Sequence, residues 1–164
     1  MNSIHDMILP SIIVGMLLTL ILSVQMVMVE SSVETRVTQD LQGFADVAVE
    51  VIQQDIRNLN QIIELTDTTI TFSERSGHIV SISRSGRDLH VIRKVNGDTL
   101  SYQQHALRLS QISFESVQMH GFSDVILRVR VQTQSTPAEE VGKRAHRHKA
   151  FAHKDIYLRN LHLN

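Results

Sequence analysis

The residues with the clearest chemical potential form a short basic segment near the C-terminus. His146, His148 and His153 carry imidazole nitrogens of the kind that bind Zn²⁺, Ni²⁺ or Cu²⁺ in proteins. Five lysine and arginine side chains lie among these histidines, and their positive field opposes a dication. The nearest acidic residues are Glu140 and Asp155. We therefore interpret the segment as a solvated basic loop, keep the three histidines as weak metal candidates, and expect no cofactor.

Other catalytic constellations are missing from the sequence. The chain has nine histidines and many serines, but no G-x-S-x-G nucleophile elbow. Its seven glycines are scattered, and none belongs to a G-x-x-x-x-G-K-[ST] phosphate loop. Because cysteine is absent, disulfides, thiolate catalysis and cysteine-based zinc sites are excluded. We expect a protein that is not an enzyme and has no small-molecule substrate.

Charge and aromatic content argue against nucleic-acid binding. The net charge is −1, whereas a general nucleic-acid binder needs a basic surplus to neutralise phosphates. Tryptophan is absent and aromatic residues make up 4% of the chain, which leaves little material for stacking on bases or sugars. We expect no nucleic acid among the partners.

The element that must position the rest of the chain is the apolar run at residues 7–29. It holds no charged side chain, lies between Asp6 and Glu30, and is long enough to cross a hydrocarbon core of ~30 Å as a helix. A cleaved signal peptide has a shorter apolar region, a basic start and a small-residue cleavage site, whereas the first basic residue here is Arg36. The run predicts a single-pass transmembrane helix behind a short tail at residues 1–6.

An amphipathic helix is predicted at residues 30–66, continuous with the membrane helix. Apolar residues recur there at steps of three or four, and no proline interrupts them, although Gly43 is a candidate bend. We interpret the apolar stripe as the face that packs on a sheet, and a coiled-coil partner remains the alternative. The stripe comprises Val37, Leu41, Phe44, Ala48, Ile52, Ile56, Leu59 and Ile63.

Beyond the helix, the apolar period changes to that of half-buried strands. Ile70 and Phe72 alternate with threonine and serine, and short runs of the same kind follow between turn residues. Asn96 and Gly97 give the strongest hairpin signal, because both residues tolerate the positive φ of a tight turn. We expect residues 67–164 to form an antiparallel β-meander.

The basic segment interrupts this β pattern. Residues 136–154 are charged and poor in large apolar side chains, so we expect an exposed loop, and residues 155–161 predict a last strand. The expected fold class is therefore α+β. A long N-terminal helix, first transmembrane and then amphipathic, packs on the antiparallel β-meander.

This layout resembles that of type IV pilins and type II secretion pseudopilins, and most of all the J-type pseudopilins and W-type minor pilins. The similarity is to a divergent member without the prepilin cleavage signature. It extends over almost the whole chain through short elements at Asp55-Ile56-Arg57, Ile70-Thr71-Phe72, Leu89 to Arg93, Leu107 to Phe114 and Leu158-Arg159-Asn160.

The resemblance implies a structural subunit of a pilus or secretion-type assembly. It further implies an anchor in the inner (cytoplasmic) membrane, a periplasmic or extracellular module, and hetero- or homo-oligomers with other pilin-like subunits. A row of small or hydroxyl residues, at the spacing that lets helices approach closely in lipid, is the expected packing interface. The row is Ser11, Gly15, Thr19 and Ser23.

Two further expectations concern the partners of the chain. Membrane lipid contacts the anchor, and a basic loop near the membrane is able to attract anionic headgroups. The alternative to an assembly subunit is a single-pass envelope scaffold or sensor whose soluble module binds a protein or ligand.

Overall fold

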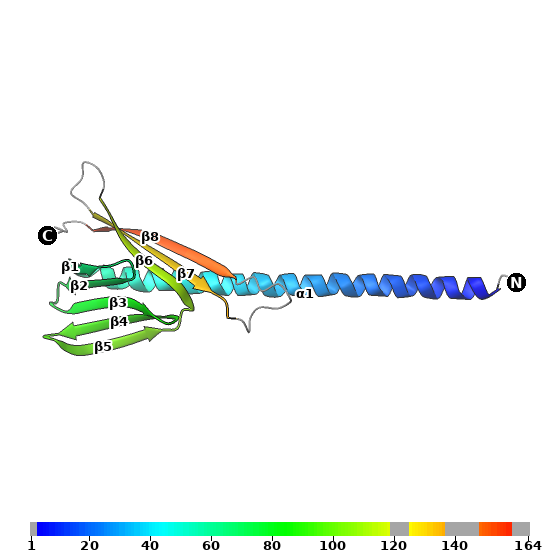
Figure 1. Ribbon diagram of the computed structural model, residues 1–164, viewed down its shortest axis with the longest axis horizontal. Helices are drawn as coiled ribbons and strands as arrows, with labels where there is room; N and C mark the ends of the chain where they lie inside the picture. The colour runs from blue at the N-terminus through cyan, green and yellow to red at the C-terminus, as the bar shows by residue number, and fades with distance from the viewer. Residues whose placement is uncertain (1–2, 119–124, 137–147, 159–164) are drawn as a thin grey trace.

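A computed structural model describes residues 3–118, 125–136 and 148–158. One helix, α1 (Ser3–Ile56), has 54 residues and is therefore about 80 Å long. Its N-terminal half projects alone from the molecule, and its C-terminal half runs along two antiparallel sheets (Figure 1). The predicted α+β class, with a long apolar N-terminal helix and antiparallel strands, is confirmed.

The predicted extension of the helix to residue 66 is wrong. The helix ends at Ile56, and Leu59–Leu65 forms strand β1, so Leu59 and Ile63 lie on a strand and not on the helix. β1 pairs with β2 (Thr69–Glu74) through two register shifts within seven residues. These irregularities replace the two-residue alternation of a regular strand by the wider apolar spacing that is typical of a helix.

The first sheet has five strands in the order β1-β2-β3-β4-β5. β3 (Ile79–Ser85), β4 (Asp88–Val95) and β5 (Asp98–His105) follow β2 as sequential hairpins. The predicted turn between β4 and β5 is confirmed, because Asn96 has φ 50° and Gly97 has φ 94°. Positive φ at both central residues is what a tight two-residue hairpin needs.

The second sheet has three strands in the order β6-β7-β8, which corrects the expectation of one continuous meander. These strands are β6 (Leu109–Gln118), β7 (Val125–Gln134) and β8 (Lys149–Leu158). Between the sheets Arg108 has φ 54°, and the chain leaves β5 without pairing β6 to it. The two sheets are thus able to cover the helix from different sides (Figure 1).

The predicted loop at residues 136–154 is also partly wrong, because 149–154 belongs to β8. Ala150 and Ala152 are the helix-facing residues of this part of the strand, and their small size hides the apolar alternation. Residues 137–147 of the predicted loop, and 159–161 of the predicted last strand, lie outside the described residues.

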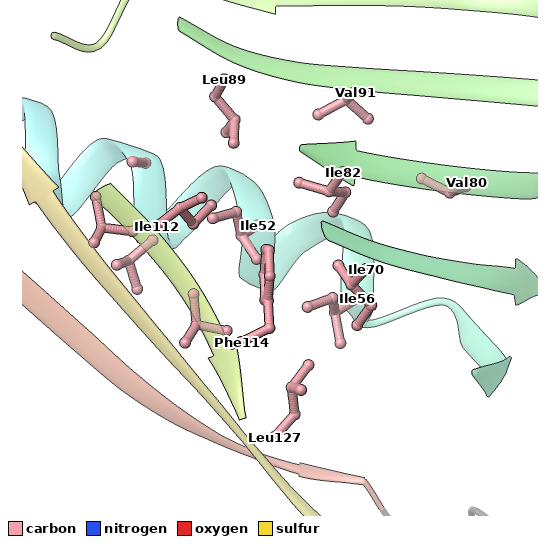
Figure 2. Packing of buried hydrophobic residues seen from close by; sticks show 14 of the residues in the cluster. Ile52, Ile56, Ile70, Val80, Ile82, Leu89, Val91, Ile112, Phe114 and Leu127 are labelled. Atoms are coloured by element: carbon pink, nitrogen blue, oxygen red, sulfur yellow. The ribbon is translucent and has the colours of Figure 1, made fainter. Parts of the chain in front are cut away.

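The core lies where α1 meets the inner faces of both sheets. Ile52 and Ile56 of α1 lie among Ile70 of the five-stranded sheet and Phe114 and Leu127 of the three-stranded sheet (Figure 2). Within the predicted stripe, four helical residues are buried and two are partly buried, and two further helical residues join them in the core. The buried four are Leu41, Ala48, Ile52 and Ile56, the partly buried two are Val37 and Phe44, and the additional two are Ala45 and Val49.

The helix enters the module at Leu41. Thr133 of β7 is buried there and donates its hydroxyl to the Leu41 carbonyl at 2.9 Å. From residue 10 to residue 40 no helical side chain is classed as buried, whereas from Leu41 to Ile56 one face of the helix is part of the core. The same helix therefore serves as both anchor and core element.

Candidate functional surfaces

The apolar half of α1 is the largest exposed hydrophobic surface of the described chain. From Ile12 to Val29 every large apolar side chain has between 48% and 76% of its area exposed. In the described residues this is the one helix long and apolar enough to span a membrane. Such a surface is stable only when lipid or other helices cover it, which fits a single-pass membrane protein.

The row of small residues lies on this exposed half. The Thr19 hydroxyl donates to the Gly15 carbonyl at 2.8 Å, and the Ser23 hydroxyl donates to the Thr19 carbonyl at 2.8 Å. A Cβ added at Gly15 would meet no atom within 4 Å. The hydroxyl groups of Thr19 and Ser23 are thus satisfied by their own helix, and at Gly15 the helix backbone is open to a neighbour.

A buried ionic cluster joins the C-terminal end of α1 to the five-stranded sheet. Asp55 is 8% exposed and accepts a charge-assisted hydrogen bond from Arg93 of β4. The Arg93 Nε lies 3.6 Å from Glu74 Oε1, and His78 Nδ1 lies 3.5 Å from Glu74 Oε2. Burial raises the pKa of Asp55, and Arg93 opposes this rise.

The sequence predictions name Asp55 only as part of the element Asp55-Ile56-Arg57, so this cluster was missed. The available signal is its position three residues after Ile52, which places Asp55 on the buried face of the helix. Because a buried carboxylate needs a cation, the position also predicts a basic partner on the sheet. Which basic residue is the partner of Asp55 depends on the order of the strands, and the sequence pattern leaves this order open.

The solvent face of the three-stranded sheet carries paired charges. Arg128 donates from Nε and Nη2 to the two carboxylate oxygens of Asp155, at 2.8 and 3.0 Å. Arg130 lies 3.3 Å from Glu115 on the neighbouring strand. The hydrogen bond from Arg128 lowers the pKa of Asp155. Both pairs are cross-strand neighbours, so they support the sheet register.

The structure does not bring the histidine candidates together. His146 lies outside the described residues, and His148 and His153 stand roughly 16 Å apart along extended chain. Among the residues that the structure describes, no group of three His, Asp or Glu side chains has the geometry to hold a metal ion.

A groove runs between α1 and β8, and we call it the β8 groove. One part, of about 770 Å³, lies between Gln42 to Gln54 of the helix, with Arg57 just beyond its end, and Phe151 to Lys154 on the strand. A second part, of about 590 Å³, continues past Arg57 to the end of β8 and shares Gln53, Arg57 and Lys154 with the first. The first part is lined mainly by polar and charged side chains, and the second part has a mixed polar and apolar lining, which distinguishes the groove from the apolar half of the helix.

Comparisons of the chain with protein families, with curated proteins and with solved structures find no match.

Proposed function

We propose that the chain is a membrane-anchored structural subunit of a pilin-like assembly, of the pilus or secretion type. The observation that carries this proposal is the double role of α1. Its apolar half projects, exposed, from the module, and its other half belongs to the module core without a break in the helix. A force or displacement applied to the anchor is therefore transmitted to the sheets by one rigid element.

In this proposal, subunits associate through the row formed by Ser11, Gly15, Thr19 and Ser23. Apolar side chains gain little by leaving lipid for a protein surface, so helices associate in membranes where small residues allow close packing. The internal hydrogen bonds of Thr19 and Ser23 support this role, because no hydroxyl of these two residues is left unsatisfied at the contact. Lipid covers the remaining faces of the helix.

The location follows from the same proposal. The anchor lies in the inner membrane, and the module lies on its periplasmic or extracellular side, where an assembly that leaves the cell is built. The partners are other pilin-like subunits, as hetero- or homo-oligomers.

The β8 groove favours a second candidate function. A single-pass scaffold or sensor needs a binding surface on its soluble module, and the groove lies on the module and away from the apolar half of the helix. The two functions differ in which part of the chain contacts the partner.

Substitution of Gly15 tests the leading proposal. Gly15→Leu fills the contact face of the row without disturbing the fold, because nothing lies within 4 Å of the added Cβ. Val24→Leu adds bulk on the opposite face of the same helix and serves as the matched control. We expect co-purification of subunits from membranes to fall several-fold for Gly15→Leu and to stay near wild type for Val24→Leu. Equal recovery with both variants would contradict helix packing through the row.

A further inference from the structure

The β8 groove borders the free edge of a strand. β8 pairs with β7, and no strand of the described residues lies on its other side. An edge of this kind presents a row of backbone donors and acceptors. We propose that the groove binds an extended polypeptide segment of a partner, which adds to β8 as a further strand of the sheet.

The ladder geometry shows which backbone groups face the groove. The Ser135 amide donates to the His148 carbonyl at 3.0 Å, which fixes the even-numbered residues of β8 as those bonded to β7. The N–H and C=O groups of the odd-numbered residues therefore point away from β7. These residues are Lys149, Phe151, His153, Asp155 and Tyr157.

One of these edge groups already accepts a hydrogen bond from across the groove. The Gln42 side-chain amide donates to the Phe151 carbonyl at 3.3 Å. The contact shows that the edge carbonyls are accessible to a donor between helix and strand. The Gln42–Phe151 contact also closes the end of the groove nearest the membrane helix. An added strand therefore occupies the part of the groove from His153 onward. It extends to Phe151 when the Gln42 side chain moves aside.

The lengths of the two walls agree. From Gln42 to Ile56 the helix rises about 21 Å, and from Phe151 to Leu158 the strand spans about 23 Å. Helix and strand run in the same direction along this length, because the Phe151 end faces Gln42 and the Leu158 end faces Ile56. The groove therefore accepts about seven residues of extended chain.

Opposite charges lie at the two ends of the groove. Asp46 lies toward the end near Gln42, Arg57 and Arg75 line the other end, and Glu50 and Lys154 lie near the middle of their walls. The carboxylate of Asp155 at that basic end is already held by Arg128, so it does not neutralise these cations.

The charge distribution defines the chemistry of the partner segment. A strand that pairs antiparallel with β8, the slightly more stable arrangement, has its N-terminal end beside Arg57 and Arg75 and its C-terminal end beside Asp46. It therefore carries Asp or Glu near its start and Lys or Arg about six residues later, with both side chains facing the helix. The polar and charged lining of the part between Gln42 and Lys154 makes a lipid chain a poor occupant there.

Two synthetic probes test the charge requirement on the full chain in detergent micelles. The forward probe is a labelled, capped peptide Glu-Thr-Val-Thr-Val-Thr-Lys, and the reversed probe is Lys-Thr-Val-Thr-Val-Thr-Glu. We expect the forward probe to bind about tenfold more tightly by fluorescence anisotropy, because reversal replaces two exposed attractions by two repulsions. The doubly substituted chain Asp46→Lys, Arg57→Glu should reduce or invert this preference. Equal binding of the two probes by wild type overturns the charge assignment.

Substitution of His153 tests strand addition. His153→Pro removes one N–H that faces the groove and no hydrogen bond to β7, whereas His153→Ala keeps the N–H. We expect the proline variant to bind the forward probe at least severalfold more weakly than the alanine variant, with similar circular dichroism for both. Equal binding by the two variants overturns strand addition.

Backbone methylation of the forward probe tests the same point without altering the protein. Probes N-methylated at positions 2, 4 and 6, or at positions 3 and 5, block opposite edges of the peptide. Strand addition predicts that one set abolishes binding and that the other leaves it nearly unchanged. Equal effects of the two sets, or no binding of the unmethylated forward probe, overturn the proposal.

Discussion

The double role of α1 predicts that a single helical core residue controls the stability of both sheets. Ile52 has 0% of its area exposed and packs with residues of the five-stranded and three-stranded sheets. Ile52→Ala removes three carbon atoms, about 2.4 kcal/mol of transfer free energy at ~0.8 kcal/mol per buried group. The remaining cavity adds to this loss, so we expect the free energy of unfolding to fall by about 3 to 4 kcal/mol.

The assay is urea unfolding of the full chain in micelles, followed by a brief protease pulse that digests unfolded modules. With a denaturant slope of about 2 kcal/mol per molar urea, the midpoint should fall by roughly 1.5 to 2 M. Val47→Ala on the same helix is the control, because Val47 is 47% exposed, and its midpoint should move by less than about 0.3 M. If the two variants unfold at the same midpoint, the helix is not a core element and the reasoning fails.

Two further outcomes concern the ionic pairs. Arg93→Met leaves the Asp55 carboxylate without its cation and should lower the unfolding free energy by about 2 kcal/mol in the same assay, less than for a fully buried pair because the Arg93 side chain is 20% exposed. Thermal unfolding against pH separates the two carboxyls. The pKa of Asp55 is raised, so its contribution to stability is complete below about pH 3.8 and is lost as the pH rises through the raised pKa. Wild type should therefore lose stability over that rise in pH, and Asp55→Asn should not show this loss. The pKa of Asp155 is lowered, so its contribution to stability is present above about pH 3.8 and is lost as the pH falls through the lowered pKa. Asp155→Asn should therefore lower the melting temperature at neutral pH and have no such effect in acid. Parallel pH profiles for the Asp55 and Asp155 variants would contradict these assignments.

Local signals in the sequence were sufficient for the apolar half of the long helix and for the turn between β4 and β5. The charge-free run at residues 7–29 predicts the exposed apolar half of α1, because spanning a membrane depends on length and composition alone. The turn at Asn96 and Gly97 was predicted because positive φ is a property of single residues. Neither feature depends on which distant segments meet.

The features that sequence reasoning missed depend on distant contacts. The helix ends at Ile56 because β1 pairs with β2, and the bulges of β1 disguise its strand period. The division into two sheets depends on whether β6 pairs with β5 in addition to β7, and the apolar alternation is the same in both cases. Asp55 needed the position of Arg93 on β4 to be recognised as a buried ion pair. The β8 groove exists only because β8 is an edge strand beside α1.

Cysteine cross-linking in native membranes tests the central proposal, helix packing through the small-residue row, most directly. The chain has no cysteine, so single cysteines at Gly15, Thr19 or Ser23 report one helical face, and cysteines at Leu17 or Val24 report the other. We predict adducts at the three row positions, which mass spectrometry identifies as subunits of the same helix-and-sheet architecture, and little adduct at the two controls. Equal yields on both faces, or adducts only with unrelated envelope proteins, would contradict the proposed assembly.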